Sequence, residues 1–155
     1  MSDHYGRFQL SNATEQARRA ARQIVEAFGS HNVASYFAGF DPDASFVFYT
    51  EPRILGSRRD YEAAWRTWEA DGFRVLSCRS EEVDVRLIAE DVAMMTHRVR
   101  TRLVGVADEL RERETIILRR GSDGRWLGIH EHLSPEPEPE PAVARATDLH
   151  SEPER

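Results

Sequence analysis

The apolar pattern of the chain changes its period at Gly72. Before this glycine, apolar residues such as Tyr61, Ala64, Trp65 and Trp68 recur at the spacing of one helix face. After it, apolar and polar residues alternate, which is the pattern of half-buried strands. The alternation predicts four strands, at Phe73–Leu87, Asp91–Val104, Leu110–Arg120 and Trp126–Leu133. Helices followed by a run of long strands favour an α+β domain with the helices against one face of an antiparallel sheet.

Three helices and one strand are predicted ahead of the four long strands. The helices are expected at Asn12–Gly29, Asn32–Phe40 and Ser57–Gly72, and the strand at Ser45–Thr50. Asn12 and Glu15 form a capping-box pattern, and Ser57 is a favoured helix cap. To bury the aromatic residues of both halves, the sheet has to curl around the helices. The predicted fold is therefore a cone-shaped barrel, with three N-terminal helices packed on a strongly curved antiparallel sheet and a mouth suited to a ligand.

The last strand carries a carboxylate in an apolar position. Asp123-Gly124 predicts a tight turn before it, because both residues tolerate a positive φ. With strict alternation, Glu131 shares a strand face with Leu127, Ile129 and Leu133. The opposite face then carries Trp126, Gly128, His130 and His132. Burying a bare carboxylate is costly, so Glu131 is predicted to be paired, hydrogen-bonded or functional.

Composition indicates one globular domain that works outside membranes and away from nucleic acids. The 155 residues are 40% hydrophobic and 31% charged, as in ordinary soluble domains. No apolar run approaches the ~20 residues that span a bilayer. A net charge of −6 without a basic cluster argues against a nucleic-acid partner. Cys78 is the only cysteine, which excludes a disulfide framework and favours a cytoplasmic location.

The two ends of the chain are expected to lie outside this domain. Residues 1–10 are interpreted as a flexible lead-in, 11–134 as the cone domain and 135–155 as a disordered tail. The tail alternates proline with Glu136, Glu138 and Glu140. Such a segment buries too little apolar surface to offset the entropy lost on ordering.

The final hairpin resembles one in a known superfamily. Its features are Glu114-Thr115, Arg119-Arg120, Asp123–Leu127 and the ending His130-x-His132-x-Ser134. They resemble the association (hub) domain of calcium/calmodulin-dependent protein kinase II and the free-standing SnoaL-like domains of the nuclear-transport-factor-like superfamily. The resemblance implies the cone fold. It leaves the function open, since the superfamily includes ketosteroid isomerase, scytalone dehydratase, limonene epoxide hydrolase, polyketide cyclases and modules without chemistry.

The resemblance also bears on the ligand. In the hub domain, arginines on the concave face gather around a cavity that takes small carboxylates. One of them matches Arg98 here, whereas the other two fall on the apolar Ile116 and Leu133. The chain has also gained Glu131 at this place. The implied carboxylate clamp is therefore mostly lost.

A polar pocket built from Arg98 and Glu131 is predicted in place of the clamp. Arg98 shares a strand face with Met94, Glu114 can join from the next strand, and Tyr49 can lend a hydroxyl. The predicted ligand-binding residues are Arg98, Glu131, Glu114, Tyr49, Met94, Trp65, Trp68, Ile116 and Leu133. Two interpretations remain open: a structural Arg98–Glu131 pair, or catalysis with Glu131 as base and Arg98 or Tyr49 stabilising an oxyanion.

Three histidines offer a possible metal site. His130 and His132 share one strand face, and His97 could join them as a third zinc ligand. Alternation places all three on the convex side, where a subunit interface explains them better. No metal and no cofactor are predicted.

Two functions are carried forward from the sequence. The first is an oligomeric domain that binds a small, largely apolar molecule. The alternative is a cofactor-independent lyase or isomerase with an acid or base in the cone cavity. In both cases we expect at least a dimer, packed through a convex sheet face formed by Trp126, His130, His132, Val99 and Ile117.

Overall fold

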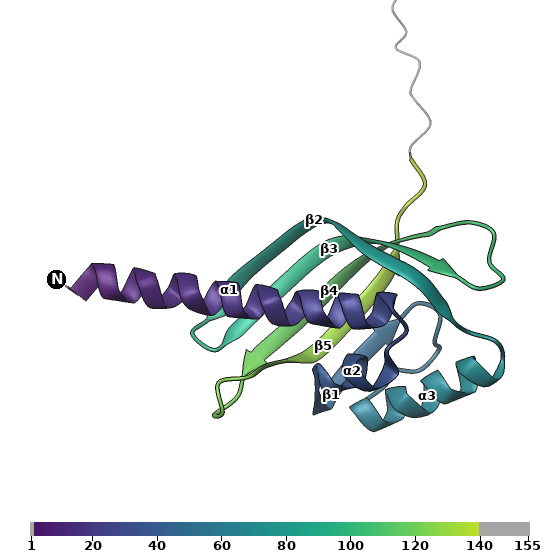
Figure 1. Ribbon diagram of the computed structural model, residues 1–155, viewed down its shortest axis with the longest axis horizontal. Helices are drawn as coiled ribbons and strands as arrows, with labels where there is room; N and C mark the ends of the chain where they lie inside the picture. The colour runs from purple at the N-terminus through teal and green to yellow at the C-terminus, as the bar shows by residue number, and fades with distance from the viewer. Residues whose placement is uncertain (1, 140–155) are drawn as a thin grey trace, which may run out of the picture.

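The computed structural model describes residues 2–139, which form three helices and one five-stranded sheet (Figure 1). The helices are α1 (Ser2–Gly29), α2 (Val33–Ala38) and α3 (Arg58–Ala70), and the strands are β1 (Phe40–Phe48), β2 (Val75–Ala89), β3 (Val92–Leu103), β4 (Leu110–Arg120) and β5 (Trp126–Pro135). The predicted α+β class and the order of its elements are confirmed.

The sheet has the strand order β1-β5-β4-β3-β2. Strands β2 to β5 form the predicted antiparallel meander, in which each strand pairs with the next along the chain. Strand β1 pairs with β5 in parallel, with Phe46 opposite Glu131. This single parallel pair, which was not predicted, brings the first strand and the last strand to the same edge of the sheet.

The helices cover one face of the curved sheet (Figure 1). Helix α1 lies across the sheet, and its predicted apolar stripe is buried at Ala13, Ala17, Ala21 and Ile24. This helix begins at Ser2, ahead of the start predicted at Asn12, and its first turns project beyond the sheet (Figure 1). The domain therefore has a long helical entry where a flexible lead-in was expected.

An aromatic cluster fills the space between α2, α3 and β1. Ser57 caps α3 as predicted, since its Oγ accepts the backbone N–H of Asp60 at 3.1 Å. The cap starts α3 so that Tyr61 and Trp65 face the core, where both are buried. The Tyr61 ring centroid lies 4.6 Å from that of Phe46. This packing fixes the Tyr61 side chain at the wide end of the cone.

A bulge in β5 changes which residues face the helices. Ile117 of β4 pairs with His130, but Leu118 pairs with Gly128, so Ile129 is an extra residue. Trp126 and Gly128 are consequently buried on the same side as Glu131. Gly128 is required there, because a Cβ would lie 2.6 Å from the Phe40 ring. The predicted face assignment is correct from Glu131 onward and wrong before the bulge.

Two further expectations concern the surroundings of the domain. None of the described helices is long and apolar enough to cross a membrane. The cytoplasmic location stays a prediction. Of the predicted tail, residues 140–155 lie outside the described part of the chain, whereas Glu136 is held against the sheet by its backbone N–H, which donates to Arg111 O at 3.0 Å.

Candidate functional site

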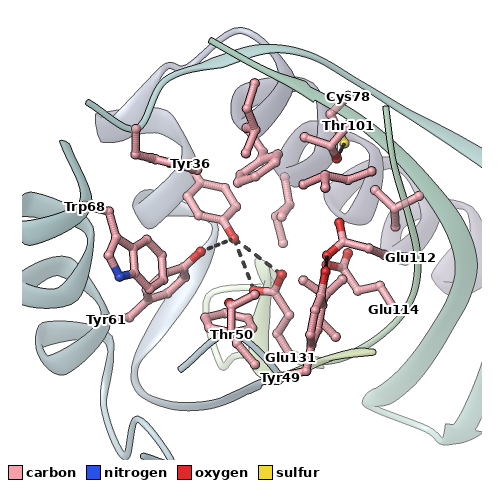
Figure 2. Close-up of a pocket in the computed structure, with 18 of the residues that line it drawn as sticks. Tyr36, Tyr49, Thr50, Tyr61, Trp68, Cys78, Thr101, Glu112, Glu114 and Glu131 are labelled. Carbon is pink, nitrogen blue, oxygen red and sulfur yellow. Dashed lines mark hydrogen bonds between the residues drawn. The ribbon is translucent and has the colours of Figure 1, made fainter. Parts of the chain in front are cut away.

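A cavity of about 460 Å³ lies between the concave face of the sheet and the helices. Apolar and aromatic side chains form most of its wall, including Phe28, Phe48, Trp68 and Phe73. The polar side chains come chiefly from the central strands and from α2 and α3 (Figure 2): Tyr36, Tyr49, Tyr61, Glu112, Glu114 and Glu131. A mostly apolar wall with a few convergent polar groups is the usual character of a small-molecule site.

Glu131 lies at the inner end of this cavity and is only 4% exposed. The Tyr36 hydroxyl lies 3.2 Å from Glu131 Oε2 and 3.1 Å from the Tyr61 hydroxyl (Figure 2). Tyr36 comes from the short helix α2, whose Asn32 cap orients it, and Tyr61 comes from α3. Tyr36 therefore holds Glu131 by a hydrogen bond without neutralising a charge on it, and Tyr61 contacts the Tyr36 hydroxyl.

Glu114 lies on the neighbouring strand β4 and contacts a buried histidine. His97 Nε2 lies 2.8 Å from Glu114 Oε1, and His97 Nδ1 lies 2.8 Å from Ser80 Oγ. Burial lowers the pKa of His97 to about 4, so the imidazole is neutral at pH 7. A neutral ring with its proton on Nε2 donates to Glu114 and accepts from Ser80. His97 therefore orients Glu114 without supplying a positive charge.

Glu114 and Glu131 form a coupled carboxyl pair. Burial raises the pKa of Glu114 to about 7. Burial and the adjacent Glu114 raise the pKa of Glu131 well above its ordinary value of 4.5. Both side chains line the same cavity, and a pair of interacting carboxyls loses its first and second proton at different pH values. Near neutral pH the pair therefore retains a proton that one carboxyl can donate, beside a carboxylate that can accept one.

A third carboxyl, Glu112, lies nearer the mouth of the cavity. The Tyr49 hydroxyl donates to Glu112 Oε2 at 2.6 Å, and Tyr49 itself is 47% exposed. Burial raises the pKa of Glu112 above its ordinary value, although the Tyr49 hydrogen bond opposes that shift. Tyr49 thus forms part of the rim and bonds to Glu112 instead of reaching Glu131.

Cys78 also faces the cavity, but its thiol ionises poorly at neutral pH. Its Sγ lies 3.6 Å from the Thr101 hydroxyl (Figure 2). Burial raises the pKa of the thiol to about 12, so the thiolate needed for nucleophilic attack is scarce at neutral pH. The carboxyl pair is the more reactive feature of this wall.

Five of the predicted ligand-binding residues lie on the cavity wall, namely Glu131, Glu114, Tyr49, Trp68 and Leu133. Trp65 and Ile116 are instead buried in the core. Met94 lies on the strand face opposite to the buried Ala93 and Met95. The aromatic and carboxylate part of the predicted pocket thus lies together, and the rest of the predicted set does not.

The predicted Arg98–Glu131 pair does not form, and the structure corrects the side on which Arg98 lies. Along β3 the side chains of Met95, His97 and Val99 are buried on the concave side, so the alternating Arg98 points outward with its side chain 46% exposed. Arg98 Nε lies 3.1 Å from Glu82 Oε2 on the outer face. Among residues 2–139 no arginine pairs with Glu131, and Arg98 does not line the cavity.

The same alternation corrects the expected metal and interface residues. His97 is buried on the concave side, whereas His132 is exposed on the other side of the sheet, so the three histidines do not come together. Within residues 2–139 no group of three His, Cys, Asp or Glu side chains is arranged to hold a metal ion. Trp126 and Val99, expected on the convex face, are buried on the concave side.

Four residues of the site were not predicted as such: Tyr36, Tyr61, Glu112 and His97. The signal for His97 is present in the sequence, because Arg98, Arg100 and Arg102 alternate with apolar residues and mark the outer face of β3. Glu112 follows from Glu114 by the same period of two. Tyr36 and Tyr61 carry no such signal, since their helical spacing is equally that of core residues.

Comparison with protein families gives one match. A family model described as a SnoaL-like domain matches residues 17–137, which span the described domain from the middle of α1 to just past β5. No curated protein sequence matches the chain.

Several solved structures share the fold at low sequence identity. An NTF2-like protein of unknown function from Pseudomonas putida KT2440 superposes with a TM-score of 0.68 at 18% identity, covering 80% of this chain and 87% of that one. A putative ketosteroid isomerase from Shewanella frigidimarina has a TM-score of 0.63 at 20% identity, with coverage of 77% and 94%. ActVI-ORFA from Streptomyces coelicolor has a TM-score of 0.62 at 16% identity, with coverage of 79% and 96%. These similarities establish the cone fold.

Proposed function

The chain belongs to the SnoaL-like domain family, and we propose that it is a cofactor-independent lyase or isomerase that transfers a proton within a small, largely apolar substrate. The observation that carries the proposal is the buried Glu114–Glu131 carboxyl pair on the cavity wall. Its fold is also that of a putative ketosteroid isomerase. Paired carboxyls with separated pKa values are a common means of acid–base catalysis near neutral pH.

The two carboxyls take different roles in this proposal. Glu114, with a pKa of about 7, is the base that accepts a proton from a substrate carbon. Glu131, whose pKa burial and the adjacent Glu114 raise well above 4.5, is the acid that donates its proton to a substrate oxygen or to a second carbon. The base predicted from the sequence was Glu131. The role moves to Glu114 because the interaction between the two carboxyls lowers the pKa of Glu114 and raises that of Glu131.

Neighbouring groups position the pair and stabilise its charges. The His97 Nε2 proton donates to Glu114 Oε1 and fixes the direction in which its other oxygen points. The Tyr36 hydroxyl donates to Glu131 and stabilises the carboxylate that remains after proton donation. Both hydrogen bonds lie among apolar and aromatic side chains, where the low local dielectric strengthens them.

A binding domain without chemistry is the alternative carried from the sequence. A tight Arg98–Glu131 pair would have favoured it, because such a pair satisfies both groups structurally. Arg98 lies on the outer face instead, and Glu131 retains an elevated pKa within an open cavity. Both functions require a bound small molecule, so they are separated by measuring proton transfer.

The test uses 5-nitrobenzisoxazole, a small aromatic compound whose ring opens when a general base removes its C3 proton and the N–O bond breaks. We expect the wild-type protein to accelerate this opening, with a rate that rises with pH through about 7 as Glu114 ionises. The double variant Glu114→Gln/Glu131→Gln should lose roughly 100-fold or more of that rate. The double variant is needed because either carboxyl of a coupled pair can serve when the other is removed.

Glu90→Gln is the matched control, because Glu90 is an exposed acid at the β2–β3 turn, away from the cavity. It should leave the rate unchanged. Full activity in the double variant would refute the acid–base proposal. A probe that binds the wild-type protein without reacting would support the binding domain.

We also propose that the protein self-associates, by a surface that differs from the one predicted. Trp126 and Val99 are buried and cannot contribute to an outer interface. Support for association comes from the edge strand β2, which exposes the large apolar side chains Leu76, Val83 and Ile88. Sedimentation at micromolar concentration should give at least a dimer, and Ile88→Glu should shift it towards the monomer. A monomeric wild-type protein would contradict this proposal.

A further inference from the structure

The cavity wall has acids and no bases. The four acidic residues that line it are Asp71, Glu112, Glu114 and Glu131, whereas no arginine lines it among the described residues. The chain contains no lysine at all. His97 touches Glu114, but burial keeps its imidazole neutral. Ionisation of any of these acids therefore gives the cavity a negative potential, which no described residue of its wall compensates.

The arginines on the strands that form the cavity wall are held in ion pairs on the outer face of the sheet. Arg100 is only 3% exposed, yet its Nη2 lies 2.8 Å from Glu136 Oε1 on the outer face. Arg98 and Arg111 contact the same Glu136 at 3.6 Å and 3.4 Å. Moving any of them into the cavity would require breaking these ion pairs and reversing the strand alternation. The wall cannot acquire a cation by rotating a side chain.

Aromatic rings form the other half of the wall. The ring centroids of Tyr36 and Tyr61 lie 6.0 Å apart at 84°, and those of Tyr61 and Trp68 lie 5.8 Å apart at 61°. Rings inclined in this way present both edges and faces to the enclosed space (Figure 2). The faces of tyrosine and tryptophan attract organic cations, most strongly where water is excluded.

We propose that the cavity selects molecules that carry a protonated amine on an aromatic or alicyclic body, and that it rejects carboxylates. This inference rests on the proposed function in naming the substrate class of the same site. The ammonium group is placed near Glu112 and the carboxyl pair, and the apolar body packs against Tyr36, Tyr61 and Trp68. A carboxylate ligand would meet only like charges, which disfavours it.

The test compares three probes of nearly equal size at pH 8: 1-naphthylmethylamine, 1-naphthalenemethanol and 1-naphthoate, which are respectively cationic, neutral and anionic. Binding is measured by calorimetry and by quenching of tryptophan fluorescence. We expect the amine to bind most tightly and the carboxylate most weakly, with roughly a tenfold or larger difference between them. Glu112→Gln should weaken amine binding roughly tenfold and leave the alcohol nearly unchanged. Glu90→Gln should change none of the three affinities.

The inference is overturned if the carboxylate binds as tightly as the amine, if Glu112→Gln leaves amine binding unchanged, or if no probe binds. Its failure is separable from failure of the proposed function. Ring opening of 5-nitrobenzisoxazole without a preference for the amine refutes the charge selectivity alone. A preference for the amine without ring opening refutes the acid–base function and leaves the selectivity standing.

Discussion

Glutamate side chains have opposite pKa shifts on the two faces of the sheet. On the outer face, Arg98, Arg100 and Arg111 surround Glu136, and these ion pairs hold the pKa of Glu136 below its ordinary value. On the concave face, no described residue places a cation beside Glu114 or Glu131, and burial raises the pKa of both. The chain therefore has enough arginine residues to neutralise its buried glutamates, but these arginines lie on the outer face of the sheet.

Such an arrangement is unfavourable for folding, which is informative about function. A solvated ion pair contributes little to stability, whereas an uncompensated buried carboxyl costs the folded state free energy. Residues that lower stability are retained where they act on a ligand. The concave face is therefore where we place the chemistry, and the outer face is where charge serves to keep the tail residue Glu136 against the sheet.

The largest expected effect is a gain in stability when the concave face loses a carboxyl. Raising the pKa of Glu114 from 4.5 to about 7 costs the folded state about 3 kcal/mol once the pH exceeds 7. Glu114→Gln removes that cost and still offers an oxygen to His97. Its free energy of unfolding at pH 8, measured by urea denaturation, should exceed the wild-type value by an amount of this order.

The pH dependence of this gain follows from the sign of the shift. Below pH 4.5 the carboxyl is protonated in both the folded and the unfolded chain, so variant and wild type should be alike. Between pH 4.5 and 7 the Glu114 carboxyl ionises in the unfolded chain before it ionises in the folded chain. The free energy of unfolding of the wild type therefore falls below that of the variant. The pKa of His97 is lowered to about 4, so its contribution to the free energy of unfolding rises with pH, opposite to that of Glu114. Both proteins contain His97, so subtracting the wild-type free energy of unfolding from that of the variant cancels this contribution. A variant less stable than the wild type at pH 8 would contradict the account.

A smaller and opposite effect is expected on the outer face. Glu136→Gln removes the partner shared by Arg98, Arg100 and Arg111, which should lower the melting temperature slightly. Because the Arg98 and Arg111 side chains are exposed, salt at about 0.5 M should reduce the difference from wild type. If Glu136→Gln instead raised stability as Glu114→Gln does, the contrast between the two faces would be lost.

The fold was predictable from the sequence because it depends on pattern. The change of period at Gly72, the Ser57 cap and the Asp123-Gly124 turn each act locally, and the structure has all three. Gly124 has a φ of 81°, as the turn requires. The parallel pairing of β1 with β5 depends on contacts between residues distant in sequence, so no local sequence pattern predicted it.

The site was predictable only in part, because strand alternation fails at a bulge. Glu131 was recognised since it follows Ile129 in an apolar strand, but the extra residue at Ile129 reverses the faces of everything before it. On β3 the alternation is regular, and the error was to place Arg98 inward when the neighbouring arginines mark the outside. The Tyr36–Tyr61 contact joins two helices, and only the folded structure brings those hydroxyls to 3.1 Å.

The most direct test of the carboxyl pair is a titration of the glutamate side chains by carbon-13 NMR, with the two signals assigned from Glu114→Gln and Glu131→Gln. The account predicts one carboxyl with an apparent pKa of about 7 and a second with a pKa raised well above 4.5, while the pKa of Glu136 lies below 4.5. Complete ionisation of every glutamate below a pH of about 5.5 would contradict it, because no proton would then remain in the cavity for catalysis near neutral pH.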